Sequence, residues 1–445
     1  MQPDPLALLR SRSYVKLLVL AALIGVPVSA AAYGFLKLVA WLQEELFTDL
    51  PEGLGFDTPP TWWPLPLLAL SGLLVALAIR RLPGKGGHSP ADGFKPAGAV
   101  PPAELPGILL AALATLSFGV VLGPEAPLIL IGSGLGVLAV RLAARDAPDQ
   151  VATVIAAAGS FAAISSLLGS PIVGAFLLLE SAGLGGPMLG VVLVPGLLAA
   201  GVGTLIFIGL DELTGFGTFS LSLPGLPPFD RPTLAMFGWA LAFGLIAPFV
   251  GRGIQLLALA LRPHVERRMI LLMPVLGVLI AGLAIGFAEA TDHPASNVLF
   301  SGQDQLGPLM DGAAEWSVGA LLLLVLCKAL AYALSLSSFR GGPVFPAMFI
   351  GAAGGIAASH LPGMELVPAV AMGIGAMCTV MLTLPLTSVL LATLLLASDG
   401  LAAMPLVIVA VVVAYVTTAH LTPAPDAPAQ GPVRATAEPQ VVSSG

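Results

Sequence analysis

The chain has 445 residues, of which 57% are hydrophobic and only 10% are charged. Soluble domains carry about 25% charged residues, so this composition excludes a soluble globular protein and predicts an integral membrane protein. The formal net charge of −7 argues against nucleic acid as a partner, and the two cysteines, Cys327 and Cys378, lie in apolar segments without disulfide or metal spacing.

The first half of the chain is predicted to consist of apolar helices joined by polar loops. Its first span runs from residue 17 to 39 and continues toward 46, and the basic residues before it place the N-terminus in the cytoplasm by the positive-inside rule. Residues 49–61 are predicted to be a loop on the far side. The further apolar segments are 62–79, 105–122, 127–144, 151–168, 171–184 and 190–210.

The second half continues this pattern, with a basic segment at 262–268 that predicts a cytoplasm-facing loop and a polar loop at 288–312. Its apolar segments are 234–261, 271–287, 318–336, 347–360, 367–384, 385–396 and 404–419. The predicted regions are therefore a cytoplasmic N-terminus (1–13), two membrane halves (14–232 and 233–421) and a disordered tail rich in Pro, Ala and Ser (422–445).

One carboxylate, Glu125, stands inside an apolar run of the first half. Charged side chains at bilayer depth are costly and usually mark an ion pathway. Gly123 allows close backbone approach, and Pro124 and Pro127 suit the first turn of a new helix. We therefore predict a helix that starts within the membrane, whose free N–H groups and positive dipole end favour anions. Glu125 would compete with a diffusing anion there and act as a gate, or would be a helix-start carboxylate without a transport role.

Several other polar residues have two interpretations each. Glu180 either takes protons from the cytoplasm or marks the polar end of the segment that starts at Pro171. Lys328 either attracts anions into the pathway or pairs with a carboxylate or backbone carbonyls. Arg340 either raises the positive potential at a pore mouth or extends to the membrane interface. The glycine-rich loop 83–90 is predicted to be flexible and to line an inner vestibule.

The two halves show an internal repeat. Gly159 lies twelve residues before Pro171, and Gly373 lies twelve residues before Pro385. In the same way, Pro127 precedes Ile131-Gly132 at the spacing with which Pro346 precedes Ile350-Gly351. Transporters with such repeats place broken helix ends near the bilayer midplane, at the interface between the repeats.

Three motifs carry a resemblance to a known family. They are Gly119-x-x-x-Gly123-Pro124-Glu125-Ala126-Pro127, the stretch Ser338 to Pro346 (SFRGGPVFP), and the paired turns Gly169-Ser170-Pro171 and Leu384-Pro385-Leu386-Thr387. The chain resembles the CLC family of chloride channels and chloride/proton antiporters over nearly the whole membrane region. The resemblance implies an all-α, polytopic fold of two repeated halves, with short broken helices that meet near the midplane.

The same resemblance implies specific site residues, a homodimer with one anion pathway in each subunit, and a bacterial inner-membrane location with both termini in the cytoplasm. Glu125 falls at the family's gating glutamate, and Lys328 falls where the family commonly keeps a basic residue. The positions implied to bind the anion are Gly87, Ser89, Gly123, Ala126, Gly342, Val344 and Phe345, and those of a proton path are Glu180 and Ser181.

The chain also departs from the family pattern. Gly87 stands at the anion-coordinating serine, so Ser89 would replace it only after a change in the loop, and Pro343 removes one backbone N–H donor. Pro124 replaces the arginine before the gating glutamate, and Ser181 stands at the proton-transfer glutamate of the antiporters. The coordinating tyrosine of the last helix has no counterpart. These departures indicate a divergent branch of the family.

The sequence therefore predicts chloride or other anion transport by a CLC-type channel that Glu125 gates. Two alternatives are a proton-coupled antiporter of chloride or another small anion, and a CLC-shaped membrane protein that does not conduct and serves assembly or binding. No residue pattern indicates an enzyme, a cofactor or a metal site, because the Ser and His residues lack a matching carboxylate arrangement. The expected partners are a small anion, protons in the antiporter case, the lipid bilayer and a second copy of the chain.

Overall fold

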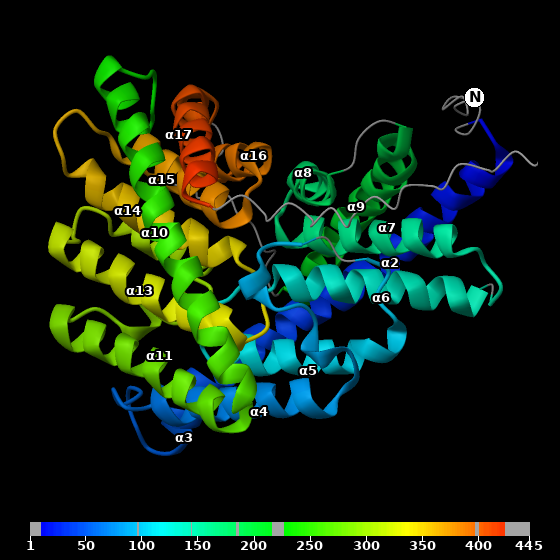
Figure 1. The fold of residues 1–445 in the computed structure, drawn as a ribbon, viewed down its shortest axis with the longest axis horizontal. Coiled ribbons are helices and arrows are strands. Elements are labelled where there is room, and N and C mark those ends of the chain that lie inside the picture. Colours follow the sequence, from blue (N-terminus) through cyan, green and yellow to red (C-terminus); the bar gives the residue numbers. More distant parts are fainter. Residues whose placement is uncertain are drawn as a thin grey trace, which may run out of the picture.

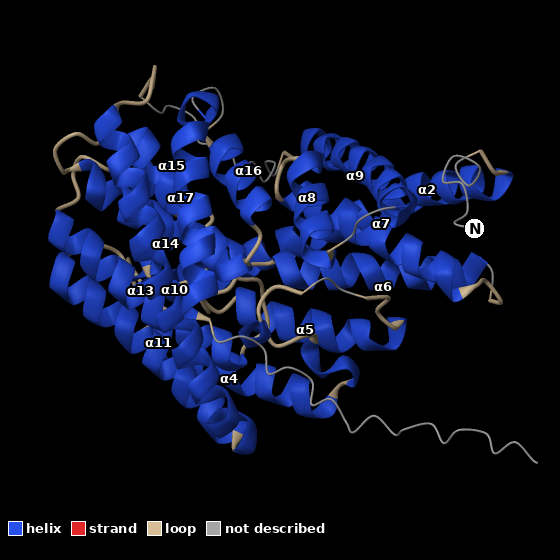
Figure 2. Ribbon diagram, turned by 45° about the horizontal axis from the view of Figure 1, so that its top comes forward, coloured by secondary structure: helices blue, strands red, loops and turns tan. Residues whose placement is uncertain are grey.

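The computed structural model describes residues 10–95, 98–143, 145–183, 187–215, 227–396 and 400–422. Within these segments the chain forms helices joined by loops and contains no extended strand (Figure 2). Nine of the described helices are long and apolar enough to cross a membrane. The chain is therefore an all-α, polytopic membrane protein, as predicted. The predicted tail lies outside the described residues from residue 423 onward.

The helices of the first half lie largely on one side of the molecule and those of the second half on the other (Figure 1). An exception is α4, which packs against α11, so the halves interlock. The first half contains α2 (Arg12–Glu44), α3 (Leu50–Gly53), α4 (Pro64–Arg81), α5 (Leu105–Leu116), α6 (Glu125–Ala143), α7 (Asp149–Leu167), α8 (Pro171–Ala182) and α9 (Pro187–Thr214). The second half contains α10 (Leu234–Arg267), α11 (Met269–Thr291), α12 (Leu306–Asp311), α13 (Val318–Ser338), α14 (Val344–Ser359), α15 (Leu366–Leu382), α16 (Pro385–Leu395) and α17 (Gly400–Leu421).

Hydroxyl side chains begin three of the long helices. Ser11, Thr233 and Ser317 each accept a hydrogen bond from a backbone N–H in the first turn of α2, α10 and α13, respectively. Such caps satisfy one of the N–H groups that a helix start leaves without an internal partner.

Corresponding helix pairs cross in the same way in the two halves. A Cβ atom at Gly132 of α6 would overlap the carbonyl of Gly159 in α7, and a Cβ atom at Gly351 of α14 would overlap the carbonyl of Gly373 in α15. These are the glycines that the spacing of the repeat singled out. Small residues allow the two backbones to approach closely where membrane helices cross.

Several predicted boundaries were wrong by a few residues or more. The first span continues through a π-helical turn into α3 and ends at Gly53, so only the later part of the predicted loop 49–61 is non-helical. The predicted loop 262–268 is helical up to Arg267 despite Pro263, and Arg262 and Glu266 form an ion pair one turn apart in this stretch. The predicted loop 288–312 contains the short helix α12.

Candidate functional site

Two loops, one from each half, meet next to the predicted gate. The N–H of Gly123 donates to the carbonyl oxygen of Gly342 over 2.8 Å, and the N–H of Gly342 donates to the carbonyl oxygen of Gly123 over 2.6 Å. Cβ atoms at either glycine would overlap the carboxylate of Glu125. Gly123 and Gly342 therefore let the two backbones and the carboxylate share one small volume. Their own N–H groups are used in this bridge, and their predicted role as anion ligands stays a prediction.

Glu125 joins the starts of two helices that come from different halves. Its side chain is completely buried and is part of the first turn of α6. The Oε1 atom accepts a hydrogen bond of 2.8 Å from the N–H of Phe345, in the first turn of α14. The Oε2 atom has no hydrogen-bond partner among the described residues. An ionised carboxylate at this point is stabilised by the positive ends of both helix dipoles and by the Phe345 N–H.

Side chains of α5 and α13 hold the two loops in place. The Tyr332 hydroxyl donates to the carbonyl oxygen of Pro343 over 2.9 Å, and the Ser335 hydroxyl accepts from the N–H of Val121 at 3.2 Å. The hydroxyl of Thr115 accepts from the N–H of Arg340 at 3.3 Å. These contacts fix the backbone on both sides of Glu125, and none of them was predicted from the sequence, because they depend on how α5 and α13 approach.

Lys328 is turned toward backbone carbonyls. Its side chain is completely buried, and the Nζ atom donates to four carbonyl oxygens, those of Asn297, Val298, Leu299 and Phe300, at 2.9 to 3.4 Å. The Nζ atom also lies 4.2 Å from the ring centroid of Phe349 in α14. Of the two interpretations from sequence, these contacts favour the one in which backbone carbonyls hold the lysine. Its role as a pathway charge stays a prediction.

Removing the ammonium of Lys328 is expected to destabilise the fold. The Lys328→Met variant would leave several buried carbonyl oxygens without their donor, and each such loss costs about 1–3 kcal/mol. We expect a lower thermal unfolding midpoint for the purified protein in detergent. Lys16→Met, which changes an exposed lysine of α2, is the matched control and should leave the midpoint unchanged. Equal midpoints for the two variants would contradict a structural role for Lys328.

Glu180 caps a helix of the other half. Its Oε1 atom accepts from the N–H of Leu386 at 2.9 Å, and its Oε2 atom accepts from the N–H and the hydroxyl of Thr387 at 2.8 and 2.6 Å. The carboxylate thus satisfies free donors at the start of α16. Ser181 makes a local bond, in which its hydroxyl donates to the carbonyl of Leu178 over 3.0 Å. The predicted proton path through these two residues stays a prediction.

A small cavity of about 40 Å³ lies between the loop that precedes α5 and the starts of α6 and α14. Of the residues implied to bind an anion, Ser89 and Ala126 line it, and Arg340 lines it as well. Gly87 does not, and its N–H donates to the carbonyl of Gly84 over 2.8 Å instead. The cavity therefore brings together part of the predicted site and the predicted pathway charge Arg340.

Comparison with protein families identifies this arrangement. Residues 85–419 match the family model described as "Voltage gated chloride channel". The chain belongs to the CLC family. The CLC match covers both helix starts that meet at Glu125, as well as the loop that lines the cavity.

Curated relatives extend the match over most of the chain. "Putative ion-transport protein YfeO" of Escherichia coli O7:K1 is 29% identical over 380 residues, which are 84% of this chain and 84% of the relative. The protein of the same name from Shigella boydii serotype 4 is 30% identical over 380 residues, with the same coverage of both chains.

Solved structures share the fold at low sequence identity. A slow cyanobacterial Cl⁻/H⁺ antiporter superposes with a TM-score of 0.72 at 19% identity, covering 91% of this chain and 94% of the other. A CLC-type fluoride/proton antiporter superposes with a TM-score of 0.64 at 20% identity, covering 91% and 96%. A eukaryotic CLC transporter gives a TM-score of 0.69 at 16% identity, covering 92% and 72%. The CLC fold predicted from the motifs is therefore confirmed.

Proposed function

We propose that this CLC protein transports chloride or another small anion across the membrane, between the starts of α6 and α14, and that Glu125 is the gate. The observation that carries the proposal is the buried Glu125 carboxylate on the N–H of Phe345. Helix starts with free N–H groups favour anions, and here a tethered carboxylate takes the place that a diffusing anion would occupy.

In this proposal the charge of Glu125 decides whether the pathway is closed. The ionised carboxylate competes with the anion for the Phe345 N–H and repels it. Protonation removes the negative charge and weakens the hydrogen bond, so the side chain can leave and an anion can replace it. Flux is then expected to rise as the pH falls. Val344 and Phe345, whose backbone starts α14, are the proposed ligands of the arriving anion.

A second proposal is proton-coupled antiport. Two of the solved structures with the same fold carry titles that name antiporters, one of chloride and one of fluoride. In that case Glu125 would carry the proton at its own position, and Glu180 or water would carry it toward the cytoplasm. The three hydrogen bonds that Glu180 accepts at the start of α16 argue for capping as its main role.

The Glu180→Gln variant is expected to be less stable than the wild type. If the protein is an antiporter, the variant should still couple anion transport to proton movement. The amide keeps the size of the side chain but turns one acceptor into a donor that faces the N–H groups of α16, a loss of about 1–3 kcal/mol. The thermal unfolding midpoint and the proton flux of reconstituted protein are the two measurements, with the exposed Glu212→Gln as the control. Full stability together with abolished proton movement would instead assign Glu180 to the proton path.

The deciding experiment is chloride efflux from proteoliposomes with the external pH recorded at the same time. Efflux together with proton movement in the opposite direction would establish the antiporter, and efflux without proton movement would establish the channel. A folded protein that moves neither chloride, bromide, nitrate nor fluoride, with or without Glu125→Ala, would overturn both and leave the non-conducting role.

We also propose a homodimer in a bacterial inner membrane with both termini in the cytoplasm. Large apolar side chains on α8, α16 and α17 are exposed in the single chain. Two of these helices, α8 and α16, begin at the Pro171 and Pro385 turns, which resemble the paired helices at the family's dimer interface. Examples are Ile172, Leu386 and Leu401. Cross-linking in membranes tests the homodimer. The accessibility of single cysteines introduced at either end of the chain tests the location of the termini.

A further inference from the structure

The charge around the small cavity near Glu125 is one-sided. Two cationic side chains, Arg340 and Lys95, line the cavity together with His88, and none of the described residues that line it is acidic. Its volume of about 40 Å³ exceeds the roughly 10–15 Å³ that a single water molecule needs. The cavity is therefore large enough for a small ion with little accompanying water, and its surroundings favour a negative one.

Arg340 is mostly buried and has no carboxylate partner among the described residues. Its Nε atom donates to the carbonyl of Lys85 over 3.3 Å, and its Nη1 atom donates to the carbonyls of Ser338 and Phe339 over 3.0 and 3.2 Å. No hydrogen bond of Nη2 to a described residue is present. Three neutral carbonyls thus hold the guanidinium in place, and Asp92 and Glu266 act on its charge only from beyond contact distance. Arginine stays protonated, and a mostly buried charge without a contacting counterion is costly, so an anion from solution would stabilise this site.

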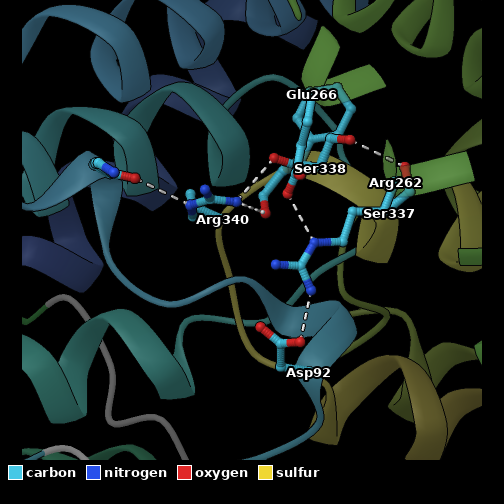
Figure 3. Close-up of polar contacts among 8 residues, drawn as sticks. Asp92, Arg262, Glu266, Ser337, Ser338 and Arg340 are labelled. Atoms are coloured by element: carbon cyan, nitrogen blue, oxygen red, sulfur yellow. Dashed lines mark hydrogen bonds and ion pairs between the residues drawn. The ribbon is translucent and has the colours of Figure 1, made fainter. Parts of the chain in front are cut away.

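The nearest acids are held by a different arginine. Figure 3 shows Arg262 of α10 between Asp92 and Glu266, while Arg340 is turned toward the backbone. The Nη1 atom of Arg262 lies 2.6 Å from the carboxylate of Asp92, and its Nε atom lies 2.7 Å from that of Glu266. Asp92 belongs to the same loop as Ser89, next to the cavity. Both acids also act on the charge of Arg340 without contacting it, so we expect them to move toward Arg340 if Arg262 is absent.

We propose that this cavity binds a small monovalent anion on the guanidinium of Arg340, and that Arg262 is a positioning residue that keeps the Asp92 carboxylate away from that guanidinium. The inference rests on the proposed function, because it names a ligand of the same pathway. Gly87 offers no side-chain hydroxyl at this site, and Pro343 offers no backbone N–H. In the proposed site, the guanidinium of Arg340, from the second half, supplies the positive charge in their place. The small volume of the cavity selects a monovalent anion such as chloride over the larger sulfate or phosphate.

The test measures chloride binding to the purified protein by calorimetry and locates bromide by anomalous diffraction. Arg340→Gln is expected to weaken chloride binding by about tenfold or more, the effect of losing one hydrogen bond to a charged group. Arg262→Gln is expected to weaken it as well, although Arg262 does not line the cavity, and adding Asp92→Asn to that variant should restore part of the lost affinity. Arg268→Gln, an exposed arginine just after α10, is the matched control and should change nothing.

Each result separates this inference from the proposed gate. Bromide within hydrogen-bond distance of Arg340 Nη2, together with restoration by Asp92→Asn, supports the site. Wild-type chloride affinity in folded Arg340→Gln overturns it, even if Glu125→Ala changes flux as expected. If Arg340→Gln does not fold, the Arg262 and Asp92 variants decide. Unchanged chloride affinity in Arg262→Gln, or no restoration when Asp92→Asn is added, overturns the positioning role of Arg262. Bromide density elsewhere in the wild type overturns the role of Arg340 as the anion ligand.

Discussion

The Glu125→Ala variant is expected to raise anion flux at neutral pH and to remove its increase on acidification. The substitution removes the carboxylate that occupies the Phe345 N–H. A hydrogen bond to a charged group contributes about 1.5–3 kcal/mol, so its loss at a gate corresponds to a rise of about tenfold or more in flux at pH 7. In the wild type, flux should rise as the pH falls, because protonation produces the open form. In the variant, the flux at high pH and the flux at low pH should both equal the flux of the open form.

The measurement is chloride efflux from proteoliposomes between pH 5 and pH 8. Glu125→Gln separates charge from size, because the amide cannot ionise but still fills the site, and it should remove the pH dependence with a smaller rise in flux. Glu365→Gln is the matched control, since Glu365 also stands at a helix start but is exposed and makes no capping hydrogen bond. A Glu125→Ala protein that keeps the wild-type pH profile would rule out Glu125 as the gate.

The helix starts around Glu125 were predictable because they depend on local signals. A carboxylate in an apolar run, flanked by Gly123 and two prolines, predicted the start of α6 to within two residues. Equal spacing in the two halves predicted that Gly132 corresponds to Gly351 and Gly159 to Gly373, and the structure places these glycines at matching helix crossings. Such signals lie within a few residues of one another, or repeat at a fixed distance, and can therefore be read from one sequence.

The contacts that complete the site join residues far apart in the chain, and no local signal indicates them. The Phe345 N–H meets Glu125 across 220 residues, and Arg262 meets Asp92 across 170. The sequence leaves two interpretations of Glu180, because its three donors come from α16 of the other half. The basic charge of segment 262–268 predicts a loop, whereas the structure continues α10 to Arg267, with Arg262 and Glu266 paired one turn apart.

The Gly342→Ala variant is expected to disturb the gate through packing alone. A Cβ atom at this position would overlap Glu125 Oε2 and lie 3.0 Å from the N–H nitrogen of Ala126. Either the carboxylate must leave, or the Gly123–Gly342 bridge must open, and overpacking of this kind typically costs about 1–3 kcal/mol. We therefore expect a lower thermal unfolding midpoint together with a rise in flux at pH 7, in the same direction as Glu125→Ala.

A glycine of α14 provides the matched control for this substitution. A Cβ atom at Gly354 would meet no atom within 4 Å, so Gly354→Ala adds the same methyl group to α14, the helix that follows Gly342, without contact, and it favours the helical backbone. It should not lower the midpoint, and it should leave the flux unchanged. Combining Gly342→Ala with Glu125→Ala should give back part of the lost stability, because the methyl group then has room, and the two effects on flux should not add. Additive effects on flux would mean that Gly342 and Glu125 act at separate points, and that the shared volume between the two helix starts is not the gate.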